Sequence, residues 1–246
     1  MLASKMGNIE AVKKILVHDH TTIDRKTQSG KTALMIALDN SNIAIATLLI
    51  LEGSDINLKT NSGHTPLMYA LYKGYENNLL ELLVNYEADI NAKTDKGLTP
   101  LIIAIESGLS KKTIAFLVKN GANINQRTID GWTPLLLATN KGISSAVINY
   151  LIDEGADVNA RTSRGWTPLM LSIKNRMGKS VLKNLIHHNA DLYAKTNEGV
   201  SIESIARKAG YDNIRNEFET IVDEHKQLLE KQARQRELDA LRKKYE

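Results

Sequence analysis

Short apolar runs alternate with polar stretches along the chain, and one such run returns at a fixed interval. Thr-Pro-Leu, two largely apolar residues and then Ala or Ser occur at residues 65–70, 99–104, 133–138 and 167–172, with a looser copy at 32–37 and a degenerate one at 201–206. A glycine precedes each copy, at positions 30, 63, 97, 131, 165 and 199. The spacing is 33 residues once and 34 thereafter. This fixed period predicts a solenoid of small repeated units.

Each copy also predicts a short helix that begins at the threonine. Gly takes the positive-φ position of a tight turn, Thr caps the helix through its hydroxyl, and Pro fits the first turn. Leu135 and Ala138 then lie one turn apart, with the small residue where a neighbour approaches closely. Further along, Val147 and Leu151 predict a second helix, which the glycine of Gly-Ala-Asp-Val-Asn at 155–159 ends.

These motifs resemble the ankyrin-repeat family, whose pattern is G-x-T-P-L-H-x-A-A, a second helix and G-A-D-V-N. The resemblance covers residues 2–220, and several copies agree in phase. It implies an all-α solenoid of stacked antiparallel helix pairs joined by β-hairpin loops. It also implies that the protein binds other proteins, without identifying the partner.

The period divides the chain into successive segments. We expect a partial N-terminal capping repeat at 1–27, full repeats at 28–60, 61–94, 95–128, 129–162 and 163–196, a C-terminal capping repeat at 197–222 and a charged helical tail at 223–246. Glu203 replaces the core leucine of the motif, as a terminal repeat with a solvated outer face requires. From Asp212 onward one long helix is expected, with Ile214, Phe218, Ile221 and His225 in phase with the core.

Two positions that recur along the repeats are interpreted as structural, not functional. The family's histidine after Thr-Pro-Leu is replaced by apolar residues, so we expect stability to rest more on apolar packing; these residues are Met35, Met68, Ile102, Leu136 and Met170. An asparagine recurs at one phase, at Asn57, Asn91, Asn125 and Asn159. Its side-chain amide is expected to satisfy backbone groups of the adjoining loop.

Composition narrows the functional classes. The net charge is +4, from 32 basic and 28 acidic residues, which slightly favours an acidic partner and is weak evidence for nucleic acid. The chain has no cysteine, which excludes disulfides, thiolate catalysis and cysteine-based zinc sites. No secretory signal is visible, so the compartment stays open: cytoplasmic by default, or exported if an upstream signal peptide has been trimmed.

No catalytic constellation is visible. The six histidines are scattered, and His187 and His188 point about 100° apart on a helix, so they do not share one metal. The glycines are spaced by repeats and do not form a phosphate-binding loop. We therefore expect a non-enzymatic protein with no cofactor, no metal and no small-molecule substrate.

The remaining candidate is a surface. In the architecture that the resemblance implies, residues around the turn glycine and at the end of each first helix project from one concave side. The expected partner-binding residues are His64, Tyr72, Lys73, Leu98, Ile129, Asp130, Trp132, Asn140, Lys141, Arg164, Trp166 and Lys174. Both tryptophans of the chain belong to this set, and Trp is enriched in interface hot spots. An apolar stripe with a basic rim predicts a partner protein or peptide with acidic residues.

Three alternatives remain open at this point. Each indole could instead lie flat over its own hairpin and only stiffen the loop. The protein could self-assemble through the C-terminal helix, where Leu228, Leu238, Leu241 and Tyr245 form a thin apolar seam, although a solvated helix extension is favoured. Binding of nucleic acid or another acidic polymer is less favoured, because no concentrated Lys/Arg face supports it.

Overall fold

The computed structural model describes residues 1–75, 78–209 and 212–245, and the side chains of residues 212–218 and 240–245 are outside the described set. This part of the chain is helical and contains no β-strand, apart from one isolated bridge between Lys195 and Ser201. The chain forms two compact units, Met1–Leu137 (unit 1) and Ala138–Glu246 (unit 2). The predicted all-α fold is confirmed.

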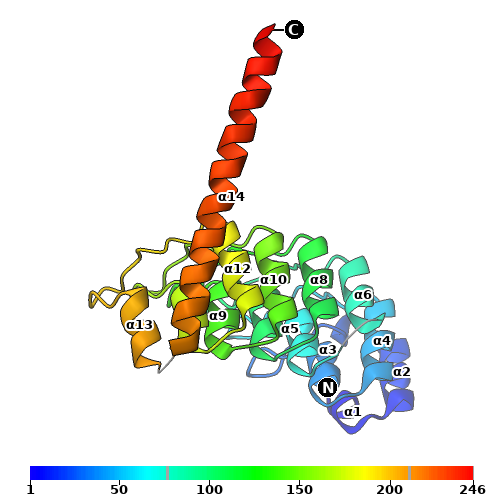
Figure 1. Cartoon of the computed structure of the whole chain (residues 1–246). Coiled ribbons are helices and arrows are strands. Elements are labelled where there is room, and N and C mark those ends of the chain that lie inside the picture. The colour runs from blue at the N-terminus through cyan, green and yellow to red at the C-terminus, as the bar shows by residue number, and fades with distance from the viewer. Residues whose placement is uncertain (76–77, 210–211, 246) are drawn as a thin grey trace. The chain divides into compact units, whose positions relative to one another are not determined.

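Unit 1 is built from pairs of short helices (Figure 1). In chain order these are α1 (Leu2–Met6), α2 (Ile9–His18), a 3-10 helix (His20–Thr22), α3 (Ala33–Asp39), α4 (Ile43–Leu51), α5 (Pro66–Tyr72), α6 (Asn78–Asn85), α7 (Pro100–Glu106) and α8 (Lys111–Lys119). The first helices α1, α3, α5 and α7 contact one another in sequence, and the second helices α2, α4 and α6 do the same. Each first helix therefore packs on its own partner and on the first helix of the next pair.

Unit 2 repeats this arrangement. Helix α9 (Pro134–Lys141) contains the division between the units, and α10 (Ser145–Asp153), α11 (Pro168–Lys174), α12 (Lys179–His187), α13 (Ile202–Lys208) and α14 (Asp212–Tyr245) follow. Here α11 contacts α13, while α10, α12 and α14 contact in sequence.

The first helices begin where the sequence predicts, because a hydroxyl residue caps each one. The side-chain oxygen accepts a hydrogen bond from the backbone N–H three residues further on, at 3.2–3.4 Å, in Thr32, Thr65, Thr99, Thr133, Thr167 and Ser201. This bond satisfies one of the N–H groups that a helix leaves unpaired at its start. The preceding glycines all have positive φ, between 73° and 82°.

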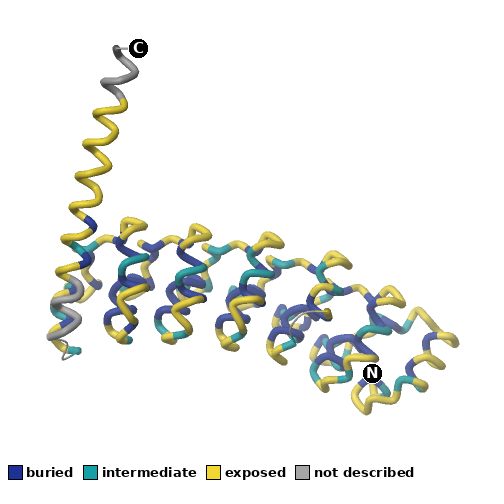
Figure 2. The backbone as a smooth tube through the Cα atoms, turned by 45° about the vertical axis from the view of Figure 1, so that its right-hand side comes forward, coloured by how far each residue is buried: buried dark blue, intermediate teal, exposed yellow. Residues whose placement is uncertain are grey.

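The core of each unit is a row of apolar residues between the helices, shown in dark blue in Figure 2. The residues that stand where the family has histidine are fully buried, with 0% exposure at Met35, Met68, Ile102, Leu136 and Met170. Apolar packing at this position is thus as expected. Glu203, in place of the core leucine, is exposed, which agrees with a terminal repeat.

Side-chain amides tie the loops of successive repeats together. The Nδ2 of Asn57 donates to the carbonyl of Glu87 at 2.9 Å, and its Oδ1 accepts from the N–H of Asp89 at 2.7 Å. Asn91 and Asn159 make the same pair of bonds to residues 30 and 32 positions further along. The structural interpretation of the recurring asparagine is confirmed for these three residues.

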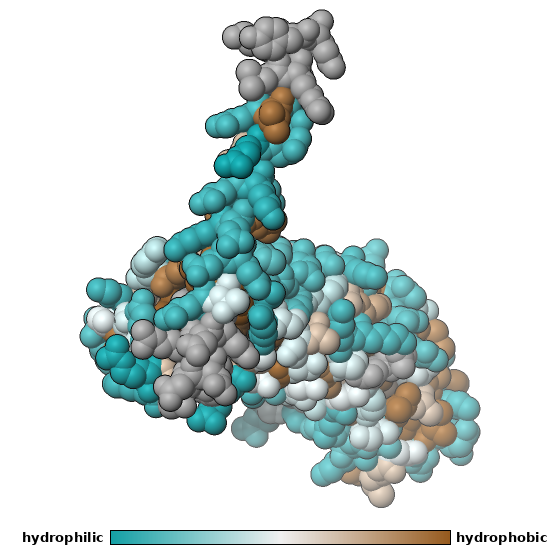
Figure 3. Space-filling model, viewed as in Figure 1, coloured by the Kyte–Doolittle hydropathy of each residue, from teal (hydrophilic) through white to brown (hydrophobic). Residues whose placement is uncertain are grey.

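Helix α14 packs on α12 near its start and is solvated beyond that point. Ile221 and His225 are 1% and 9% exposed, and Lys183 of α12 pairs with Glu224 at 2.6 Å. Ile214 and Phe218, expected on the same face, lie outside the residues whose side chains are described. Residues 226–239 are all exposed, as Figures 2 and 3 show for the projecting part of this helix. Among the described residues, no helix is long and apolar enough to cross a membrane.

Candidate partner-binding surface

One position of the repeat has the same environment in every copy but a different side chain. The residue after the turn glycine donates its backbone N–H to a threonine Oγ1 four residues earlier, at 3.0–3.2 Å, and its side chain is half-buried. The residues at this position are Lys31, His64, Leu98, Trp132, Trp166 and Val200. The backbone thus fixes the place of a side chain that the core leaves free to vary.

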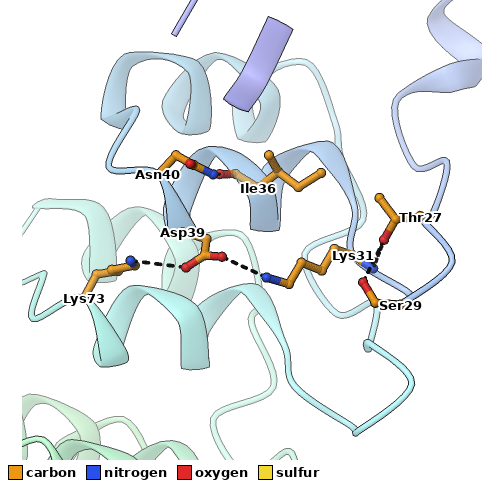
Figure 4. A network of polar contacts seen from close by, with 7 residues as sticks. All are labelled: Thr27, Ser29, Lys31, Ile36, Asp39, Asn40 and Lys73. Carbon is orange, nitrogen blue, oxygen red and sulfur yellow. Dashed lines mark hydrogen bonds and ion pairs between the residues drawn. The ribbon is translucent and has the colours of Figure 1, made fainter. Parts of the chain in front are cut away.

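In unit 1, a carboxylate joins two lysines from successive repeats (Figure 4). Asp39, at the end of α3, lies 2.8 Å from the Nζ of Lys31 and 3.2 Å from the Nζ of Lys73. Lys31 belongs to the same repeat as Asp39, whereas Lys73 follows α5 in the next one. All three side chains keep 31–37% exposure, so the network lies at the surface and remains accessible.

Aromatic rings adjoin this network. The ring centroids of His64 and Tyr72 are 5.8 Å apart, those of His64 and Tyr69 are 6.2 Å apart, and Lys31 Nζ lies 5.1 Å from the Tyr69 centroid. The Nδ1 of His64 is also 2.8 Å from the Oγ of Ser62. Lys31 therefore makes a cation–π contact and an ion pair at once, and Tyr72, 42% exposed, forms the open edge of the cluster.

The local environment shifts the pKa values of this cluster. The hydrogen bond with Asp39 raises the pKa of Lys31, and the same bond lowers the pKa of Asp39, with Lys73 adding to the effect. Burial lowers the pKa of His64 and raises the pKa of Tyr72. The network is therefore charged near neutral pH, whereas the environment of His64 favours the neutral ring.

The other expected residues of unit 1 lie on neighbouring turns. Leu98 and Trp132 are half-buried, and the turn residues Ile129 and Asp130 are exposed, Ile129 by 72%. The backbone N–H of Ile129 donates to the carbonyl of Lys96 at 3.2 Å, which links its turn to the preceding one. Leu98, Ile129 and Trp132 thus add apolar side chains to these turns, Asp130 adds a carboxylate, and none of the four belongs to the buried core.

In unit 2, a lysine covers one of the tryptophans. Lys174 Nζ lies 5.1 Å from the ring centroid of Trp166, so the half-buried indole makes a cation–π contact with the end of its own repeat's first helix. Lys174, Lys141 and Arg164 are exposed and Asn140 is half-buried. The carbonyl of Asn140 accepts a hydrogen bond from Asn175 Nδ2 at 2.8 Å.

The expected series Leu98, Trp132 and Trp166 is divided between the units, the first two residues in unit 1 and Trp166 in unit 2. Sequence reasoning did not place Lys31, Asp39 and Tyr69 in the candidate site. Lys31 and Asp39 occupy positions that vary from repeat to repeat, and this variation is the sequence feature that could have assigned them to the candidate site. Their pairing across a full helix, eight residues apart, becomes visible only in the fold.

The described residues contain no group of three or more His, Asp or Glu side chains placed to hold a metal ion. His187 and His188 end α12, as expected for a helix end. Both side chains are exposed. His187 lies beside His225 of α14, with ring centroids 5.6 Å apart.

Comparison with known proteins agrees with this architecture. The family described as "Ankyrin repeats (3 copies)" matches residues 1–60, 41–128 and 101–196. An ankyrin repeat domain from Acinetobacter baumannii is 33% identical, over 77% of this chain and 97% of that one, with a TM-score of 0.70. No match was found among curated proteins.

Two further structures share the fold at lower identity. The human ASB11 ankyrin repeat domain is 22% identical (89% of this chain, 95% of that one, TM-score 0.72), and the Bcl-3 ankyrin repeat domain is 23% identical (85% and 94%, TM-score 0.72). The repeated caps, turns and helix pairs, together with these matches, show that the chain belongs to the ankyrin-repeat family.

Proposed function

We propose that this protein is a non-enzymatic scaffold that binds a partner protein through its turn and first-helix surface. Domains of this family are in general protein-binding modules. The proposed contact residues are His64, Tyr72, Lys73, Leu98, Ile129, Asp130 and Trp132 in unit 1, and Asn140, Lys141, Arg164, Trp166 and Lys174 in unit 2.

The position after the turn glycine carries this proposal. Each of the six residues makes the equivalent backbone hydrogen bond and is half-buried. Their side chains nevertheless include a cation, a histidine, aliphatic residues and two tryptophans. A purely structural position in a regular repeat would favour one type of side chain. Trp132 and Trp166 are only half-buried, and tryptophans that become buried against a partner give large contributions to affinity.

The test compares binding with folding. Proteins captured from the source cells by the immobilised chain are identified, and the purified partner is then titrated by calorimetry against wild type and against a variant with Trp132→Ala and Trp166→Ala. We expect the double variant to lose at least about 2 kcal/mol of binding free energy, as at a hot spot, while its melting temperature stays close to wild type.

A matched variant removes two aromatic rings elsewhere. Tyr86 and Tyr193 are 44% and 79% exposed and lie outside the proposed surface, so Tyr86→Ala with Tyr193→Ala should bind as wild type does. Early unfolding of the tryptophan variant would assign the indoles a structural role in their loops. Equal loss of binding in both double variants would place the contact surface elsewhere.

Self-association through α14 is a second candidate, because three leucines of its solvated part are exposed: Leu228 by 40%, Leu229 by 46% and Leu238 by 49%. The other two residues of the expected seam, Leu241 and Tyr245, have side chains outside the described set. Sedimentation equilibrium should give a higher mass for wild type than for a variant with Leu228→Glu and Leu238→Glu. A monomeric wild-type protein excludes this function.

A further inference from the structure

A groove in unit 1 has more lysine side chains in and beside it than its single carboxylate, Asp39, can neutralise. It lies between α1 and α3, and its lining includes Leu2, Lys5, Lys31, Ile36 and Asp39. Lys73 reaches the same carboxylate from the next repeat. Lys5 and Lys31 of the lining, with Lys73 beside it, carry three positive charges near one carboxylate, and Lys5 forms no ion pair with any described residue.

Asp39 holds two of these amines in place. Its Oδ2 pairs with Lys31 and its Oδ1 with Lys73, so both oxygens are used and the two amines lie on opposite sides of one carboxylate (Figure 4). The contact of Lys31 with the Tyr69 ring restricts this side chain further. Two lysines fixed in this way lose less side-chain entropy when a second anion binds than free lysines would.

We propose that this groove binds an acidic side chain of a partner peptide, glutamate in particular, beside Lys5 and Lys31, with Lys73 adding positive charge from the next repeat. Leu2 and Ile36 supply apolar surface for the methylene groups of the glutamate, and the amines supply the charge. Asp39 acts as an internal counter-ion that orders the lysines and weakens the attraction for the ligand. This inference deepens the proposed function, because Asp39 and Lys73 lie at the same first-helix ends as the proposed contact surface.

The probe is a fluorescently labelled hexaglutamate peptide, with hexaglutamine as the uncharged comparison, and the whole chain is used. Anisotropy measures affinity, and amide shifts of the 15N-labelled protein locate the peptide. For wild type we expect binding of hexaglutamate alone, with the largest shifts in α1, at Lys31 and at Asp39. The variant with Lys31→Gln and Lys73→Gln should bind about tenfold or more weakly, a loss of about 1.4 kcal/mol.

A charge-matched variant distinguishes specific binding in the groove from nonspecific electrostatic attraction to the whole protein. Lys93 and Lys119 are exposed elsewhere in unit 1, and Lys93→Gln with Lys119→Gln lowers the net charge equally. This control should weaken binding by no more than about threefold, because salt screens distant charges. Equal weakening in the two variants overturns the proposal. In Asp39→Asn, removal of the competing negative charge should outweigh the lost ordering of the lysines, so this variant should bind the peptide more tightly, and weaker binding also overturns the proposal.

Two further measurements separate this groove from a general anion site and from the tryptophan surface. Inorganic phosphate at the same charge concentration should displace little of the peptide, and complete displacement would show a general anion site instead. The variant with Trp132→Ala and Trp166→Ala should bind hexaglutamate as wild type does, so loss of the groove and loss of the tryptophan surface give different results. The ion pairs removed are partly exposed and contribute little to stability, so the lysine variants should fold, which circular dichroism checks.

Discussion

The side-chain oxygen of Asn91 accepts a hydrogen bond from the backbone N–H of Asn123, 32 residues further along the chain, at 2.7 Å. The same amide donates through Nδ2 to the carbonyl of Gly121 at 2.9 Å. One side chain therefore satisfies a donor and an acceptor in the loop of the next repeat. This bond pair couples neighbouring repeats through their backbones, independently of apolar packing.

Loss of this amide should destabilise the protein although the side chain is exposed. Asn91→Ala removes both hydrogen bonds, and we expect a loss of about 1–2 kcal/mol in the free energy of unfolding, measured in urea. Asn91→Asp keeps the acceptor but sets a carboxylate oxygen against the carbonyl of Gly121, so it should destabilise the protein as well. Within the described part of the chain, the side chain of Asn120 bonds only to the carbonyl of Phe116 in the adjoining helix, and Asn120→Ala serves as the local control. A larger effect at Asn120 than at Asn91 would contradict the coupling.

Substitution by alanine should destabilise the protein to different extents at two glycines with nearly equal φ. Gly53 and Gly63 have φ of 84° and 82°, so alanine at either position would introduce the left-handed strain of about 1–2 kcal/mol. A Cβ at Gly53 meets nothing within 4 Å, whereas at Gly63 it would lie 2.8 Å from the Cα of Thr94 in the next loop. Gly63→Ala should therefore cost a further 1–3 kcal/mol, roughly, because backbone must move. Equal midpoints of unfolding for the two variants would contradict this prediction, because they would show that the loop backbone moves without a measurable cost.

The Asp39 network should make stability depend on acidic pH. Because the hydrogen bond from Lys31 lowers the pKa of Asp39, the folded state favours the ionised carboxylate. This stabilisation is fully present above the unfolded pKa of about 3.9 and is lost as the pH falls through that value towards the lowered pKa. Urea unfolding of Asp39→Asn should show a smaller decrease between about pH 6 and about pH 3 than wild type. Parallel profiles would contradict this linkage.

Docking of α14 on α12 should weaken at mildly acidic pH. Burial lowers the pKa of His225, its Nδ1 has no hydrogen-bond partner among the described residues, and His187 lies beside it. The neutral ring is thus favoured in the folded state. The stabilisation is present above the unfolded pKa of about 6.5 and decreases as the pH falls from there towards the lowered value.

Hydrogen exchange of residues 219–225 tests this expectation. The charged groups of α12 that act on this turn of α14 are Lys183 and Lys179, which lower the pKa of Glu224, the residue before His225, and Glu224 pairs with Lys183. After correction for the intrinsic rate, protection in wild type should decrease between about pH 7.5 and about pH 5.5. His225→Leu should remove most of this change. The same decrease in His225→Leu would assign the pH effect to other groups.

The sequence predicted the fold well because the repeat uses local rules. Thr caps, Gly turns and helix-spaced apolar residues act within a few positions of one another, so Thr99 or Gly97 can be interpreted without knowledge of the rest of the chain. The role of the recurring asparagines also followed, since the period places each one at an equivalent loop. The candidate surface was predictable only as a set of positions that the core does not use.

By itself, the sequence determined the period, the helix caps, the buried apolar positions and the variable position after each glycine. Only the tertiary structure decided which side chains meet: Asp39 with Lys31 and Lys73, and His225 with His187. The reason is physical. Caps and turns depend on backbone groups three or four residues away, whereas ion pairs and ring contacts depend on side-chain directions at helix ends that packing brings together.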